Sequence, residues 1–173
     1  GMRTTGNASL DNFRADLAPA QANGALATTY TFESPQRPDG QLDNVWSEQG
    51  GNFKVANVSG NNVAQGNGSD NLATLNGVSQ ANVVVQAQIK SLANGQVIAL
   101  AARYNGPGMT NNYQAILYNS NGTARASIYR NVNGTWTLIS ADVAIGPVAG
   151  VIGSTLRFEV VGSSQKLFMG NSL

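Results

Sequence analysis

The sequence predicts an all-β fold in which two antiparallel sheets pack face to face as a jelly-roll sandwich. From residue 82 onward, short apolar or alternating runs are separated by turn residues, which is the pattern of strands and hairpins. Asn-Gly pairs at 94–95, 121–122 and 133–134 lie between these runs, and both residue types tolerate the positive φ of tight hairpin turns. Helical periodicity is essentially absent, so we expect neighbouring runs to pair as antiparallel strands.

The expected strands form an earlier and a later group along the chain. The later group lies at 83–89, 97–104, 113–119, 123–130, 135–140, 155–161 and 166–169, and the earlier group at 27–33, 53–58, 62–64 and 71–75. Residues 123–130 alternate polar with apolar side chains, whereas 97–102 are nearly continuously apolar. A two-sheet sandwich accounts for both patterns, because some strands face solvent on one side and others lie in mid-sheet.

Length, charge and hydropathy limit the classes of protein that fit. At 173 residues the chain has room for one domain with a two-layer core. Only 11% of the residues are charged and the formal net charge is +1, so the sequence lacks the electrostatic footprint of a nucleic-acid-binding protein. The apolar runs fall far short of the roughly 18 residues of a membrane helix. We therefore expect neither nucleic-acid binding nor membrane insertion.

The absence of Cys and His from the sequence excludes several kinds of chemistry. Disulfides, thiolate nucleophiles, imidazole bases and the usual zinc and haem ligands are all missing. A Cys-free, Lys-poor composition rich in Asn, Gly, Ser, Thr, Ala and Val is typical of large secreted bacterial surface proteins. We therefore expect an extracellular or cell-surface location, with the native N-terminus upstream of Gly1-Met2, which is typical of a cloning start.

Several short stretches resemble one jelly-roll superfamily. They are Phe32-Glu33-Ser34, the run from Trp46 to Phe53, Ala102-Arg103-Tyr104, Asn112-Tyr113 and Asn133-Gly134-Thr135-Trp136. Together they resemble the concanavalin A-like, laminin-G-like domains over most of the chain. This resemblance implies a jelly-roll fold and is compatible with a domain from a large bacterial adhesin.

The order of the strands departs from that family. Its domains usually end on a strand similar to the text of residues 1–13, which here comes first, and the chain stops after 166–169 without it. We interpret 1–173 as a single domain with a displaced terminal strand at 1–17, a linker at 18–26 and a main body at 27–173. Circular permutation, a cut across tandem domains and an inserted segment remain open as explanations.

A gap in the sheet would expose unpaired backbone groups, so we expect residues 3–15 to fill it. The segment can do so within its own chain or by donation to a neighbour, which would produce strand-exchanged assemblies. The alternative is that residues 1–20 are a leader without regular structure.

No pair of carboxylates suited to catalysis is evident. The family's hydrolytic members carry a Glu-x-Asp-x-Glu strand that this sequence lacks, and Glu33, Glu48 and Glu159 are scattered. Glu159 alternates with Arg157 on one predicted strand face, which indicates a solvated ion pair. We therefore do not expect an enzyme.

The resemblance implies a structural calcium ion near the displaced strand. Asp11 and Glu33 would supply carboxylates, and the turn at Asn52 would supply backbone carbonyl oxygens, which together are the hard ligands that calcium prefers. The alternative is that Asp11 and Glu33 are capped by backbone N–H groups or simply exposed.

A sugar site requires aromatic platforms with amide or guanidinium donors beside them. The candidates, which would line a shared surface, are Arg103, Tyr104, Asn112, Tyr113, Tyr118 and Arg130. The alternative is ordinary core or cross-strand packing of the tyrosines. For Trp46 and Trp136 we expect burial.

We thus predict a non-catalytic extracellular binding or spacer module of a larger surface protein, with a glycan or neighbouring domains as its partner. Two alternatives remain open. One is a glycoside hydrolase-like domain without a recognisable catalytic pair, and the other is a purely structural unit that exchanges strands between chains.

Overall fold

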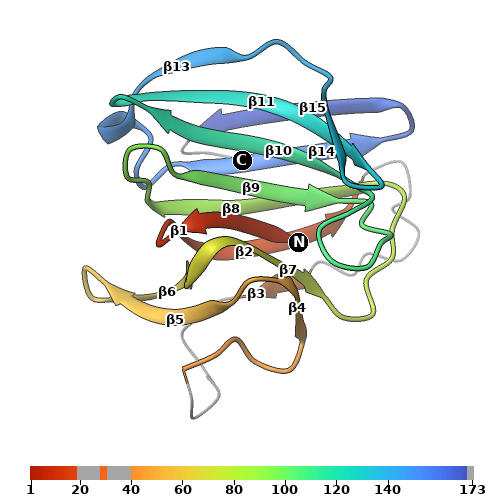
Figure 1. Cartoon of the computed structure of the whole chain (residues 1–173), viewed down its shortest axis with the longest axis horizontal. Coiled ribbons are helices and arrows are strands. Elements are labelled where there is room, and N and C mark those ends of the chain that lie inside the picture. The colour runs from red at the N-terminus through yellow and green to blue at the C-terminus, as the bar shows by residue number, and fades with distance from the viewer. Residues whose placement is uncertain (19–27, 31–39, 171–173) are drawn as a thin grey trace.

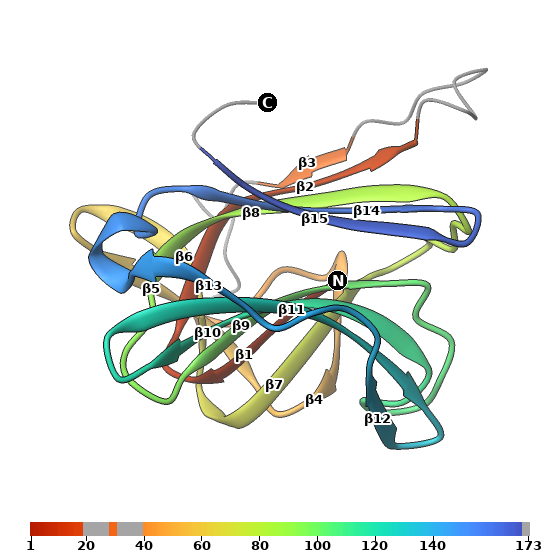
Figure 2. The same cartoon turned by 90° about the horizontal axis from the view of Figure 1, so that it is seen from above.

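The computed structural model describes residues 1–18, 28–30 and 40–170, and shows two sheets packed face to face (Figures 1 and 2). Every strand pairing within these residues is antiparallel. The predicted all-β, two-sheet antiparallel sandwich is confirmed. In the described ranges, no helix has the length and apolar character needed to cross a membrane.

The larger sheet, which we call sheet A, has eight strands. Their order is β12 (Thr135–Leu138), β11 (Thr123–Val132), β10 (Asn112–Ser120), β9 (Val97–Ala102), β1 (Met2–Gly6), β7 (Gly68–Leu75) and β4 (Trp46–Gly50), with β13 (Val143–Pro147) also paired to β11.

The second sheet, sheet B, has seven strands. Their order is β15 (Ser164–Gly170), β14 (Thr155–Val161), β8 (Val83–Ser91), β2 (Ser9–Leu17), β6 (Asn61–Gly66) and β5 (Phe53–Val58), with β3 (Thr28–Tyr30) paired to β2. A short 3₁₀ turn, η2 (Val148–Gly150), follows β13 on the way to β14.

Most predicted strands are confirmed, and the turn chemistry explains their ends. Asn121 and Asn133 have φ of 52° and 49°, and the glycine after each has φ of 86°, so both pairs form the tight hairpin turns that were predicted. Three strands were missed as separate elements, namely β1, β4 and β13. The predicted strand at 27–33 is described only at β3, and its remaining residues lie outside the described ranges.

The N-terminal segment forms two strands rather than one, and it bridges the sandwich. β1 lies between β9 and β7 in sheet A, and β2 lies between β8 and β6 in sheet B (Figure 2). The chain turns between them at Gly6, where φ is 56°. The segment at 3–15 therefore fills the middle of both sheets within its own chain, instead of forming a leader without regular structure.

The core lies between the sheets and is built from the inward side of each strand. Its largest fully buried side chains include Phe13, Phe53 and Phe158 of sheet B and Met2 of sheet A. Trp46 of β4 packs edge to face on Phe13 at 5.0 Å between ring centroids and is buried, as expected. The expected burial of Trp136 is wrong. Trp136 is 38% exposed and lies on β12, at the edge of sheet A.

Candidate functional site

The outer face of sheet A, which points away from the core, carries an unusual set of side chains. On β10 the residues Ala115 and Leu117 pack in the core, so the alternate positions Asn112, Gln114 and Ile116 point outward. Opposite them on β11 lie the outward residues Asn131, Tyr129 and Ser127, respectively. Polar and aromatic side chains therefore share this face in register.

Arg3 of β1 lies at the centre of this face. Its Nε and Nη2 donate to the two carboxylate oxygens of Asp70 at 2.7 and 2.9 Å, and its Nη1 donates to Gln114 Oε1 at 3.3 Å. The guanidinium also lies 5.4 Å from the ring centroid of Trp136, which meets Tyr129 edge to face at 6.4 Å. A bidentate ion pair, an amide and two aromatic rings thus converge.

The contact between Arg3 and Trp136 shows that this face is concave. Three strands separate β1 from β12, and neighbouring strands lie about 4.8 Å apart, so perpendicular side chains on a flat sheet would stand about 19 Å apart. The observed 5.4 Å requires the sheet to curve and both side chains to lean across it.

The segment 103–111, which joins β9 to β10, closes one end of the concave face. The carbonyl of Met109 accepts hydrogen bonds from the side-chain amides of Asn112 and Asn131 at 3.0 and 3.2 Å. Its side chain reaches across to β4, where a Cβ added to Gly50 would meet Met109 Cε at 2.9 Å. Gly50 therefore leaves room for this crossing.

Three polar atoms on the concave face are buried without a hydrogen-bond partner. They are Asn112 Oδ1, Gln114 Nε2 and Ser127 Oγ, on residues that are 2%, 0% and 2% exposed. An unsatisfied buried polar group costs about 1–3 kcal/mol, so such groups call for an explanation such as a bound ligand or ordered water. Their clustering on two adjacent strands marks this face as a candidate site.

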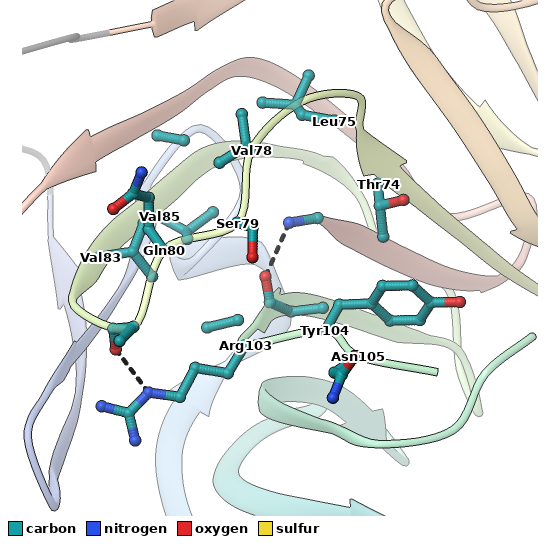
Figure 3. Close-up of a pocket in the computed structure, with 15 residues that line it drawn as sticks. Thr74, Leu75, Val78, Ser79, Gln80, Val83, Val85, Arg103, Tyr104 and Asn105 are labelled. Carbon is teal, nitrogen blue, oxygen red and sulfur yellow. Dashed lines mark hydrogen bonds between the residues drawn. The ribbon is translucent and has the colours of Figure 1, made fainter. Parts of the chain in front are cut away.

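A separate pocket of about 410 Å³ lies at one end of the sandwich (Figure 3). Its floor is apolar and comes from both sheets, with Ala15, Val83 and Val85 from sheet B and Leu75 and Ala102 from sheet A. Its rim is polar and includes Ser79, Gln80, Arg103 and Asn105. The pocket has the size and lining of small-molecule sites.

Arg103 is held beside this pocket by its neighbours. Its Nε donates to Ala81 O and its Nη2 to Gly162 O, both at 2.6 Å, and its guanidinium lies 5.9 Å from the Tyr113 ring centroid. These contacts offset a left-handed backbone with φ of 50°, which disfavours residues with a Cβ. Gly1 also lines the pocket.

The six predicted glycan residues do not form one surface. Arg103 and Tyr104 line the end pocket, and Tyr113 packs against the core beneath Arg103. Arg130 is the cross-strand neighbour of Tyr113 and is exposed, whereas Asn112 points to the concave face.

Tyr118 lies six residues after Asn112 on β10, so the two residues are about 20 Å apart and Tyr118 is near the other end of the strand. Its hydroxyl donates to Asp142 Oδ2 at 2.8 Å and accepts from Arg125 Nε at 3.1 Å. The hydrogen bond from Tyr118, together with Arg125, holds the pKa of Asp142 below its usual value. This polar cluster is complete without a ligand.

Two of the three predicted calcium ligands, Asp11 and Asn52, are not brought together. Asp11 accepts from the backbone N–H of Asn12 at 2.7 Å and pairs with Lys90 at 3.2 Å, while Glu33 lies outside the described residues. The backbone of Asn52 is hydrogen-bonded to Asn67, just after β6. Asp11 of β2 is level with position 63 of β6, about four residues or 13 Å away from Asn67 along the strand. Among the described residues, no cluster of three or more acidic side chains suits a metal. The calcium ion stays a prediction.

Sequence reasoning missed the centre of the concave face. Arg3 and Asp70 are 67 residues apart, and Gln114 is 111 residues from Arg3. The sequence does show that Gln114 directly precedes the apolar run 115–117 within a predicted strand, but not which residues it meets. The role of Arg157 and Glu159 was predicted correctly, since they form an ion pair at 2.5 Å on the outer face of sheet B.

Comparison with known proteins finds no family model, no curated protein and no solved structure that matches this chain.

Proposed function

We propose that this chain is a non-catalytic, glycan-binding module of a larger extracellular surface protein, and that the concave face of sheet A holds the glycan. The observation that carries the proposal is the convergence of exposed Trp136 with the Arg3–Asp70 pair, which is held in place by a hydrogen bond from Arg3 to Gln114. A bacterial cell-surface location and a relationship to concanavalin A-like domains belong to the same proposal.

The chemistry of these groups suits an uncharged sugar. The indole of Trp136 offers a flat apolar surface for the C–H face of a pyranose ring, and Tyr129 supports it edge to face. Asp70 is 38% exposed and can accept from sugar hydroxyls, while Arg3, whose side chain is 13% exposed, can donate. Because Arg3 and Asp70 neutralise each other, the face favours neutral over acidic glycans.

The proposal is tested by calorimetric titration with a panel of neutral gluco-, galacto- and manno-oligosaccharides. We expect at least one to bind, and Trp136→Ala to weaken that binding at least tenfold, because a stacking contact contributes about 1.5 kcal/mol. Thr137→Ala is the matched control, because it lies beside Trp136 on the opposite side of β12. Far-UV circular dichroism would confirm that each variant is folded.

Either of two results would overturn the proposal. If no oligosaccharide binds, glycan recognition is lost and the spacer role becomes the better account. If an oligosaccharide binds equally well to Trp136→Ala, the glycan site lies elsewhere on the molecule.

A further inference from the structure

We propose that the end pocket binds a small amphipathic anion, whose carboxylate pairs with Arg103 and whose apolar tail occupies the space between the two sheets. This site is distinct from the concave face of sheet A. It therefore does not rest on the proposed glycan function, and either proposal can fail alone.

Arg103 supplies a positive charge that pairs with no carboxylate among the described residues. Arg3, Arg14, Arg125 and Arg157 each form an ion pair with a carboxylate. Within the part of the chain that the structure describes, the Arg103 guanidinium instead donates to the backbone carbonyls of Ala81 and Gly162 and lies over the Tyr113 ring. Two of its five N–H donors serve those carbonyls, so three remain for a ligand. A guanidinium with free donors favours a carboxylate, which accepts two hydrogen bonds from it.

The position of Arg103 is fixed before any ligand arrives. Its guanidinium is tied to the segment between β7 and β8 through Ala81 and to the turn between β14 and β15 through Gly162. Figure 3 shows its side chain extended along one side of the pocket, with Nε against the Ala81 carbonyl. A charged group that is held in place loses little conformational freedom when it binds an anion.

The rest of the pocket calls for an apolar body on the same ligand. Ala15, Val83, Val85 and Ala102 on its floor are each less than 9% exposed, and none of these side chains can form a hydrogen bond. Inorganic anions would leave this floor without contacts, and alcohols would leave the guanidinium unpaired. A medium-chain fatty carboxylate satisfies both ends of the pocket.

The direct test is calorimetric titration of the whole chain with decanoate. Decanol, which has the apolar tail without the carboxylate, and acetate, which has the carboxylate without the long tail, are titrated for comparison. We expect decanoate to bind at least tenfold more tightly than either, because a hydrogen bond to a charged group contributes roughly tenfold or more. Equal binding of decanol or acetate, or no binding of decanoate, would overturn the proposal.

Two variants separate the contributions of the head group and the tail. Arg103→Gln should weaken decanoate binding at least tenfold, whereas Lys166→Gln, which removes an exposed charge on the outer face of sheet B, should leave it unchanged. Arg103→Gln also removes the hydrogen bonds from Arg103 to the loops at Ala81 and Gly162, which could disturb the fold. Ala15→Leu therefore provides a second test in which Arg103 and its charge are retained. The larger side chain fills the floor, and we expect it to abolish decanoate binding while the melting temperature stays level or rises. Unchanged decanoate affinity in either pocket variant would contradict the proposed site.

Discussion

The outer faces of both sheets carry ion pairs, but they differ in how many buried polar atoms lack a hydrogen-bond partner. On sheet B, charged residues pair with near neighbours, as in Asp11 with Lys90, Arg14 with Asp16 and Arg157 with Glu159. On sheet A, the polar residues near the centre are almost fully buried, and three of their side-chain atoms, Asn112 Oδ1, Gln114 Nε2 and Ser127 Oγ, lack a hydrogen-bond partner.

A face that only meets water gains nothing by burying unpaired amides, which each carry a desolvation cost. Sheet B has a single comparable atom, Gln86 Oε1, among the described residues. The difference supports the proposal that the partner binds to sheet A and not to sheet B.

The largest difference in stability between the two sheets is expected for substitution of Asp70 on sheet A. Asp70→Asn removes the bidentate partner of Arg3, whose side chain is only 13% exposed, and should lower the free energy of unfolding by about 2 kcal/mol. The equivalent change on sheet B, Glu159→Gln, should cost about 0.5 kcal/mol, because the cation that it leaves unpaired, Arg157, is 26% exposed, against 13% for Arg3. Urea unfolding of both variants measures the two losses, and equal losses would contradict the contrast.

A smaller effect of opposite sign is expected at Ser127. Ser127→Ala removes a buried hydroxyl without a partner, so the free energy of unfolding should rise by about 1 kcal/mol. Ser164→Ala, at an exposed position of β15, is the control and should change nothing. A loss of stability in Ser127→Ala would mean that the hydroxyl is satisfied by ordered water.

The smallest effect concerns the Tyr118–Asp142 pair at the far end of β10. Tyr118→Phe removes the hydrogen bond that does most to lower the pKa of Asp142, so that pKa should rise toward about 3.9, the value of an unperturbed Asp. Because the pKa of Asp142 is lower in the folded than in the unfolded state, its ionised carboxylate stabilises the fold at any pH above the unfolded-state pKa. This stabilisation is lost as the pH falls through the folded-state pKa.

The measurement is an NMR titration of the Asp142 carboxyl in wild type and variant, with Tyr129→Phe as the control. An unchanged pKa in Tyr118→Phe would assign the shift to Arg125 instead.

The sequence predicted the strands well where turn chemistry and alternation agreed. The hairpin turns at Asn121 and Asn133 and the strand Thr155–Val161 have the expected positions. β4 and β13 were missed because neither alternates clearly, and β13 exposes four of its five residues. Their pairing depends on strands that lie elsewhere in the sequence, namely β7 and β11.

The sequence by itself determined the fold class, because alternation, apolar runs and Asn-Gly turns are local properties of the chain. It also excluded Cys and His chemistry, which depends on composition alone. Only the tertiary structure decided which polar residues meet. Arg3, Asp70, Gln114 and Trp136 come from four strands of one curved sheet, and Arg103 reaches two loops that are 59 and 22 residues away. Such contacts depend on strand order and sheet curvature, and neither can be read from local spacing.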